Sequence, residues 1–176
     1  MVSAVTALLD EHPDWVDLAA DAQNAFNSFC RSKMWGPLLE HFPNMAALAR
    51  LMYGDASSII FHEDGVGRTE VLNSVGSRQG CSWGSFLYCL TIQPLLRQLA
   101  EEFPGCRVLA FADDVHILGP AEVVAVAYER WRFLYAAILQ GELKDSKSKC
   151  FSPSLSVAAV RAAGLPLPSR SRLWAP

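Results

Sequence analysis

A chain of 176 residues is long enough to bury a hydrophobic core and short enough to form one domain. Hydrophobic residues make up 51% and charged residues 19%, which excludes disordered, collagen-like and coiled-coil proteins. The net charge of −3 is unlike that of a dedicated basic nucleic-acid-binding domain, although residues 141–176 carry six basic and only two acidic side chains.

The first half of the sequence predicts helices, one strand and a hairpin from its hydrophobic periodicity. In chain order these elements are a helix over 1–11, a strand over 15–20, a helix broken at Gly36–Pro37, an amphipathic helix over 38–52, and strands over 57–62 and 69–75. The last two strands flank the segment from Glu63 to Gly67, whose two glycines favour a hairpin loop.

The second half continues the same alternation. It predicts a loop over 76–80, a helix over 86–99 that is kinked by Pro94, short strands over 107–112 and 115–118, a helix over 122–140, and a fraying tail from Pro153. The order of helices and hairpins predicts an α+β fold, in which helices back an antiparallel sheet.

The cysteines and the apolar runs exclude several environments. Five scattered cysteines without a Cys-x-x-Cys pair argue against a disulfide framework or a zinc site, and favour a reducing interior. Asp10 and Glu11 interrupt the first apolar run, so no secretory signal is visible. The longest uncharged run that could be taken for a membrane span, residues 80–96, is too short for one and contains serine, glutamine and proline. We therefore expect an intracellular protein, in the nucleus or the cytoplasm, without a membrane segment.

Two adjacent carboxylates, Asp113 and Asp114, stand between two apolar strands. Each buried charge costs several kcal/mol without a partner, and a like charge beside it adds to this cost. A divalent cation removes the problem, and carboxylate oxygens suit Mg²⁺. A solvated Asp-Asp turn is the alternative interpretation, because hairpin loops favour aspartate.

Two further segments are informative mainly in combination. Asp21 ends the first predicted strand and precedes a helix, where an aspartate is usually a cap. The segment 76–85 is rich in glycine and enters a helix, where backbone N–H groups favour anions. Arg78 and Gln79 supply donors beside it. Each segment alone also fits an ordinary cap or a flexible loop.

Together, these segments resemble the palm of reverse transcriptases, most closely those of non-LTR retrotransposons. The resembling segments are Asp21 with Asn24-Ala25-Phe26-Asn27-Ser28 (motif A), Arg78-Gln79-Gly80 with Gly84-Ser85 (motif B), Gln93 to Arg97 (the helix after motif B), Phe111-Ala112-Asp113-Asp114 (motif C), and Leu143 to Cys150 with Lys147 and Lys149 (motif D). The resemblance covers roughly residues 14–151. It implies a palm-like domain over 1–151 with truncated fingers and no thumb, followed by a poorly ordered tail over 152–176.

The resemblance also implies a reaction. In an RNA-directed DNA polymerase, two Mg²⁺ ions, with Mn²⁺ as a substitute, support transfer of a nucleotide from a dNTP to a primer 3′-hydroxyl. Asp21 and Asp113 would hold the ions, and Asp114 would assist them less directly. Lys149, or else Lys147, would protonate the leaving pyrophosphate. A solvated charge or a phosphate contact is the plainer interpretation of both lysines.

The remaining matched positions imply contacts to the nucleotide and the template. Phe26 stands where the family places an aromatic steric gate against a 2′-hydroxyl, although it is also compatible with an ordinary core side chain. Arg78 and Gln79 would contact the incoming nucleotide and the template. Gly80 and Gly84 would let the template backbone approach. The implied partners are an RNA or DNA template with its primer, and a dNTP.

The sequence also departs from the family. Reverse transcriptases place basic fingers before motif A and a helical thumb after motif D, whereas here twenty residues precede Asp21 and twenty-seven follow Lys149. Ser82 and Ser85 stand in a segment where prolines are frequent in the family. We therefore expect the template grip and the primer clamp to be missing, or to come from a partner chain that supplies fingers and thumb.

Three interpretations follow from this comparison. The first is a palm fragment of a retroelement polymerase with its metal carboxylates intact. The second is a catalytically inactive, co-opted or remnant palm module that binds nucleic acid. The third is a viral RNA-dependent RNA polymerase, which usually carries a glycine before the paired aspartates and a second aspartate in motif A. Ala112 and Phe26 occupy these positions and favour a DNA product.

Overall fold

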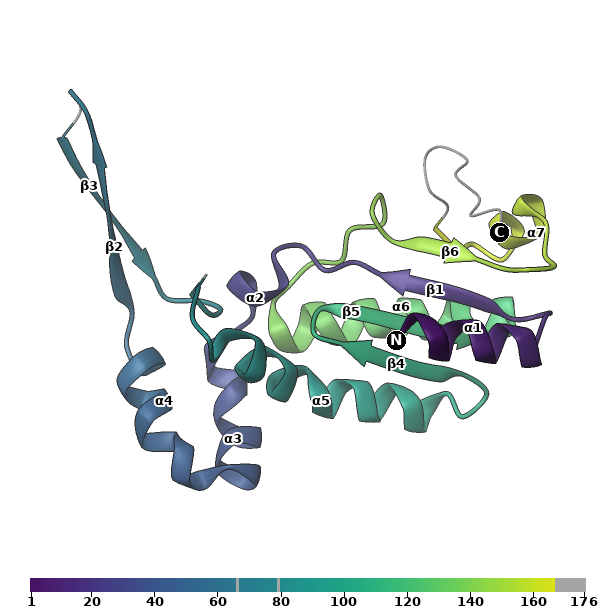
Figure 1. The fold of residues 1–176 in the computed structure, drawn as a ribbon, viewed down its shortest axis with the longest axis horizontal. Coiled ribbons are helices and arrows are strands. Elements are labelled where there is room, and N and C mark those ends of the chain that lie inside the picture. Colours follow the sequence, from purple (N-terminus) through teal and green to yellow (C-terminus); the bar gives the residue numbers. More distant parts are fainter. Residues whose placement is uncertain (66, 79, 167–176) are drawn as a thin grey trace. The chain divides into compact units, whose positions relative to one another are not determined.

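The computed structural model describes residues 1–65, 67–78 and 80–166, and it divides into two compact units. The first unit contains residues 1–23 and the chain from Gln93 onward, and the second contains Asn24–Ile92. Figure 1 shows the elements of both units. Among the described residues, no helix has the length and apolar character that crossing a bilayer requires.

A four-stranded antiparallel sheet organises the first unit (Figure 1). In the strand order β4-β5-β1-β6, the bounds are β4 Arg107–Phe111, β5 Asp114–Gly119, β1 Val16–Ala20 and β6 Lys149–Phe151. β1 pairs with β5 on one side and with β6 on the other, so that Ala20 lies opposite Val115 and Ala19 opposite Lys149. Strands that are distant in sequence therefore become neighbours.

The first unit also contains helices. They are α1 (Val2–Glu11), α6 (Ala121–Leu139) and α7 (Val157–Ala162), together with the end of α5 (Gly84–Glu102), which begins in the second unit. α6 packs against β5 and β1, and α1 contacts β1. The fully buried positions Val16, Leu18 and Ile117 alternate along their strands, which is the pattern of one apolar sheet face. The predicted α+β fold with a helix-backed antiparallel sheet is confirmed.

The second unit combines short helices with a long hairpin. Its elements are α2 (Ala25–Ser28), a 3₁₀ turn (Arg31–Met34), α3 (Trp35–His41), a second 3₁₀ turn (Pro43–Met45), α4 (Ala46–Tyr53), β2 (Ser57–Glu63), β3 (Gly67–Asn73) and the start of α5. The predicted hairpin is confirmed, with Ile60 opposite Glu70 in its centre.

The helix boundaries of the second unit differ from the prediction. The break expected at Gly36–Pro37 is wrong, because Pro37 lies in the first turn of α3, where a backbone N–H has no partner within the helix. The single helix expected over 38–52 is also wrong. It is divided at Pro43, since proline lacks the N–H and disfavours a helical residue before it. α5, in contrast, continues through Pro94.

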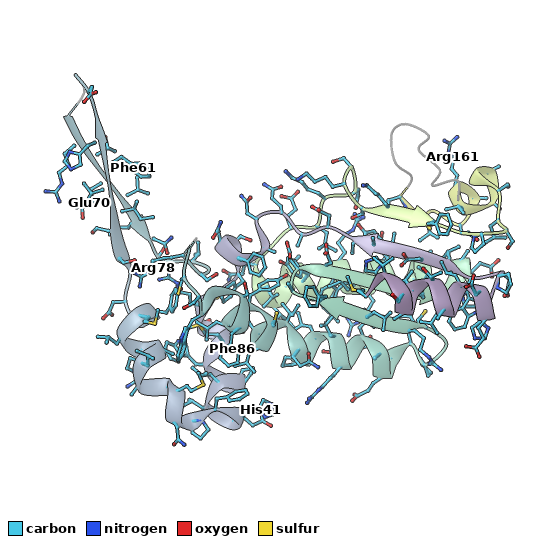
Figure 2. The ribbon with its side chains drawn as sticks, in the orientation of Figure 1. His41, Phe61, Glu70, Arg78, Phe86 and Arg161 are labelled. Atoms are coloured by element: carbon cyan, nitrogen blue, oxygen red, sulfur yellow. The ribbon has the colours of Figure 1, made fainter. Side chains whose placement is uncertain are left out.

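The two faces of the β2–β3 hairpin differ in chemistry. Because side chains alternate along a strand, Ile59, Phe61 and Val71 share one face, and Ile60 and Glu70 share the other. Phe61 is 55% exposed and Val71 is 48% exposed. Figure 2 labels Phe61 and Glu70 on this hairpin. The apolar face is thus open to solvent in the described part of this unit.

A buried arginine joins the loop after β3 to the helices of the second unit. Arg31 Nε donates to the Gly76 carbonyl at 2.7 Å, and Nη1 donates to the Asn73 carbonyl at 3.1 Å. Its guanidinium also lies over the Tyr53 ring, 5.1 Å from the centroid. Because Arg31 is only 7% exposed, these backbone carbonyls replace water around its charge. The loop that leads to α5 is therefore fixed from within the unit.

Candidate active site

The end of β1 lies beside the β4–β5 turn. Ala20 pairs with Val115, and Phe111 pairs with Asp114, so Asp21 and Asp114 are neighbours where the two strands end. Asp113 is in the turn itself. Asp21 and Asp113 are half-buried, and Asp114 is exposed. The topology therefore brings the three carboxylates predicted from the sequence to one end of the sheet.

These carboxylates suit a metal that retains water and substrate ligands. Across residues 1–65, 67–78 and 80–166, no three Asp, Glu, His or Cys side chains form a group that could hold a metal ion. Asp21, Asp113 and Asp114 lie at one end of the sheet by strand register but do not form such a group. Mg²⁺ usually binds through one or two carboxylates and completes its octahedron with water and substrate phosphates. The donor set of this sheet end therefore fits Mg²⁺.

The turn between β4 and β5 is strained at Ala112. Its φ of +57° lies in the left-handed region, which an L side chain disfavours by about 1–2 kcal/mol. Ala112 and Asp113 form the whole two-residue connection, since Phe111 and Asp114 are already paired. Hairpin turns of this length favour glycine at such a position. The turn that presents Asp113 is therefore held in place by its flanking strands.

We predict that Ala112→Gly stabilises the chain. The strain that is relieved exceeds the entropy that glycine adds to the unfolded state, which leaves a gain of about 0.5–1 kcal/mol in the free energy of unfolding. Urea unfolding followed by circular dichroism measures this difference. Ala110→Gly in β4 is the matched control, and it should destabilise the chain by about 0.5–1 kcal/mol. Equal losses in both variants would contradict the strain at Ala112.

A buried ion pair lies on the same sheet face as Asp21. Asp17 is 8% exposed, and its two carboxylate oxygens lie 2.9 and 3.0 Å from Nδ1 of His116. The hydrogen bond to Asp17 raises the pKa of His116 because it favours the imidazolium. Asp17 and Ala19 share one face of β1, and the same alternation continued past Ala20 puts Asp21 on that face, so this pair fixes β1 against β5 on the side of the carboxylates.

Lys149 begins β6 on the other side of β1. It lies opposite Ala19, and cross-strand partners share a face, so its exposed side chain is on the face that carries Asp21. Lys147 is also exposed, in the turn that precedes β6. Of the two lysines predicted as proton donors, Lys149 is the one held by a strand. Its role remains a prediction.

The next residue, Cys150, is directed to the opposite face and is chemically quiet. Burial raises the pKa of the Cys150 thiol to about 12, and the negative charge of Asp17 adds to this effect. Cys30, in the second unit, behaves oppositely, because a hydrogen bond with Ser32 lowers the pKa of its thiol. Thiolates, not thiols, react with alkylating agents.

We therefore predict that iodoacetamide at pH 8 modifies Cys30 and spares Cys150 in the folded chain. A pKa of about 12 leaves roughly a thousandfold less thiolate than an ordinary cysteine has. Peptide mass spectrometry after timed alkylation gives both rates, and the urea-unfolded chain serves as the control in which the two rates should be similar. Equal rates in the folded chain would contradict the burial of Cys150.

The predicted nucleotide-binding residues belong to the second unit. Phe26 in α2 is half-buried, and its ring meets the Tyr88 ring edge to face with centroids 5.0 Å apart. The Arg78 guanidinium donates to the Met52 carbonyl and lies over the Tyr53 ring at 5.2 Å. Both side chains thus have partners within their own unit, and Arg78 is directed toward α4.

Gly80 and Gly84 are glycines for different structural reasons. Gly80 has a φ of +79° and open space around it, so its conformation alone accounts for glycine. Gly84 is buried, and a Cβ there would lie 2.9 Å from Ser77 Oγ, so close packing accounts for it. Gln79 lies outside the described residues. The predicted site residues thus fall into two groups, one in each unit.

Sequence reasoning missed two polar residues near this end of the sheet, Asp17 and Ser148. Nothing in the sequence indicated that the carboxylate of Asp17 is buried, because a single aspartate in a short strand is usually exposed to solvent. Ser148 Oγ, which accepts a hydrogen bond from the Asp21 backbone at 3.1 Å, lies 127 residues away in sequence. Only the strand pairing reveals either contact.

Comparisons with known proteins place this geometry in context. A family model described as reverse transcriptase (RNA-dependent DNA polymerase) matches residues 4–157. The chain is similar to a telomerase from Candida albicans, solved in complex with a TWJ fragment of telomeric RNA, with a TM-score of 0.63 and 11% identity over 87% of this chain and 30% of that one. It is also similar to an apo telomerase from Candida tropicalis truncated from its C-terminal domain, with a TM-score of 0.61 and 9% identity over 89% of this chain and 34% of that one.

No curated relative matches the sequence. The chain spans about a third of the length of the telomerase chains to which it is similar. At these identities the likeness concerns the fold.

Proposed function

We propose that this chain, which belongs to the reverse transcriptase (RNA-dependent DNA polymerase) family, is the palm portion of a retroelement polymerase that adds dNTPs to a primer 3′-hydroxyl. The observation that carries the proposal is the antiparallel register, which sets Asp21 beside the Asp113–Asp114 turn. Strands held by a buried core position such carboxylates rigidly, and phosphoryl transfer depends mainly on positioning and charge stabilisation.

In this proposal, Asp21 and Asp113 hold two Mg²⁺ ions, for which Mn²⁺ can substitute, and Asp114 tunes the charge around them. When bound, these ions activate the primer hydroxyl and offset the negative charge of the leaving pyrophosphate. Lys149 is on the same face of the sheet as Asp21 and donates a proton to the pyrophosphate oxygen. The His116–Asp17 pair keeps β1 and β5 together while substrates bind.

The remaining predicted residues contact the nucleotide and the template in this proposal. Phe26 limits the space at the sugar 2′-position and so favours dNTPs. Arg78 exchanges its bond to the Met52 carbonyl for a contact to the nucleotide, and Gln79 contacts the template. Gly80 and Gly84 let the template backbone approach. The template is RNA or DNA. The non-LTR type remains a prediction.

A second function is compatible with the same reverse transcriptase fold. A palm that has lost catalysis would retain this fold and bind nucleic acid without metal chemistry. This alternative is a co-opted or remnant module, and binding of Mn²⁺ separates it from the polymerase.

We predict that calorimetry detects Mn²⁺ binding by the chain and that Asp113→Asn weakens it by about tenfold or more, because a direct ligand contributes more than an outer-shell partner does. Asp64→Asn, in the exposed β2–β3 loop, is the matched control and should bind Mn²⁺ as the wild type does. Identical isotherms for the wild type and Asp113→Asn would remove the metal claim and favour the non-catalytic alternative.

A further inference from the structure

The turn that precedes β6 binds the backbone of Asp21 on both sides. The Asp21 N–H donates to Ser148 Oγ at 3.1 Å. The Asp21 carbonyl accepts from the Lys144 N–H at 2.8 Å. Asp21 lies one residue past the end of β1, where the regular strand pairing has stopped. The segment 144–148 therefore takes over from the sheet in fixing this residue.

The Ser148 hydroxyl has a partner for its proton and for a lone pair, and it lies close to a further hydroxyl. A hydroxyl has one proton and two lone pairs. Ser148 Oγ donates to the Lys144 carbonyl at 3.0 Å, accepts from Asp21, and lies 3.2 Å from the Tyr128 hydroxyl. Ser148 is fully buried, at 0% exposure, so water has no access to replace these contacts.

The turn is anchored to the buried helix α6. Tyr128 is 2% exposed and donates its hydroxyl proton to Asp145 Oδ1 at 2.8 Å. Burial raises the pKa of Tyr128, so the hydroxyl remains a donor. Arg132, one helical turn further along α6, binds the same carboxylate at 2.5 Å. Two side chains of α6 thus hold the segment that holds Asp21.

We propose that Ser148 is a positioning residue for the metal-binding carboxylate of Asp21, with Tyr128 as its support from α6. This inference rests on the proposed function of Asp21 as a metal ligand. Ser148 binds the backbone of Asp21, so it fixes the position from which the carboxylate extends, and groups that fix a metal ligand typically change metal affinity by 10–100-fold. Ser148 also directly precedes Lys149, so the same contact sets where β6 begins and couples the placement of both residues.

The test uses the full chain and three variants. Ser148→Ala removes the acceptor for the Asp21 N–H, and Tyr128→Phe removes only the support behind it. Ser152→Ala is the matched control, because Ser152 Oγ donates to the Trp15 carbonyl at 2.9 Å at the other end of the β1–β6 pair. Hydrogen exchange of the Asp21 amide is measured by NMR, and the dissociation constant of Mn²⁺ by calorimetry.

We expect Ser148→Ala to lose protection at the Asp21 amide and to bind Mn²⁺ about tenfold more weakly. Tyr128→Phe should change both quantities in the same direction by less, and it remains informative if Ser148→Ala fails to fold. Ser152→Ala should leave both near the wild-type values. Given that Asp113→Asn binds Mn²⁺ more weakly than the wild type, a folded Ser148→Ala variant with wild-type Mn²⁺ affinity would overturn the inference. If Ser148→Ala does not fold, wild-type Mn²⁺ affinity in Tyr128→Phe would overturn it.

The two hypotheses fail differently. If Asp113→Asn binds Mn²⁺ as the wild type does, the proposed metal function fails and the positioning role falls with it, whatever the amide exchange shows. If Asp113→Asn weakens binding and the amide of Asp21 stays protected in folded Ser148→Ala, only the positioning role fails.

Discussion

Asp21→Asn is expected to lower single-nucleotide incorporation by about a thousandfold. An asparagine keeps the size of the side chain but removes the charge that a divalent cation requires. Metal stabilisation of developing charge contributes several kcal/mol, and about 4 kcal/mol corresponds to a factor of a thousand in rate. The measurement is extension of a labelled primer by one dNTP with Mg²⁺ or Mn²⁺, in which the wild type should add one or a few nucleotides.

Asp10→Asn is the control for this experiment, because Asp10 is an exposed carboxylate of α1 and its loss changes the net charge equally. The control should incorporate nucleotides at the wild-type rate. Incorporation by Asp21→Asn at that rate would contradict a role for the carboxylate in catalysis. Because the Asp21→Asn variant keeps the backbone N–H at this position, the contact to Ser148 remains, and the experiment isolates the charge from its placement.

Gly76→Ala is expected to destabilise the second unit by about 3–5 kcal/mol. Gly76 has a φ of +58°, and an added Cβ would lie 2.1 Å from the Asn27 carbonyl carbon. The neighbouring atoms belong to the backbone and cannot rotate away, so overpacking adds to the conformational strain. The adjacent contacts are lost as well, since Gly76 N–H donates to Phe29 and its carbonyl accepts from Arg31. Domains have a total stability of about 5–15 kcal/mol, so this is a large fraction.

Hydrogen exchange of residues 24–92, followed by mass spectrometry, would report this loss where it occurs. Gly65→Ala is the matched control, because Gly65 also has a positive φ, of +83°, but nothing within 4 Å of an added Cβ. It should cost only the conformational strain, about 1–2 kcal/mol. If Gly76→Ala were no worse than Gly65→Ala, the close approach to Asn27 would be wrong.

Local patterns in the sequence were sufficient to predict β1 and the β4–β5 hairpin, whereas β6 and its pairing with β1 were not predicted. Short apolar strands on either side of Asp113–Asp114 predict the β4–β5 hairpin, because a two-residue connection and alternating burial leave few other arrangements. The long helix α6 follows from its apolar periodicity, which the structure matches within a residue at each end. The prediction of a single helix over 38–52 was wrong because the apolar pattern continues through Pro43, whereas the helical backbone is interrupted there.

The site was predictable as a set of residue types, and its support was not. Asp21 and Asp113 were singled out because their segments together resemble reverse transcriptase motifs, and each alone also fits a cap or a turn. In contrast, Ser148 and Arg31 act through backbone partners, and a backbone carbonyl or N–H looks the same at every position. Such contacts become visible when the pairing of distant segments is known. The division into two compact units likewise depends on contact density and has no local signature.

The open apolar face of the β2–β3 hairpin affects the solubility of the purified protein. Long, flat strands with uncovered apolar side chains and unsatisfied edges recruit further strands, which is a common route to aggregation. With Phe61 and Val71 both about half exposed, concentrated samples are at risk of precipitating before any assay begins. A Phe61→Lys substitution, which introduces a charge on this face and leaves the end of the sheet that carries Asp21 unchanged, is a practical starting point for producing soluble material.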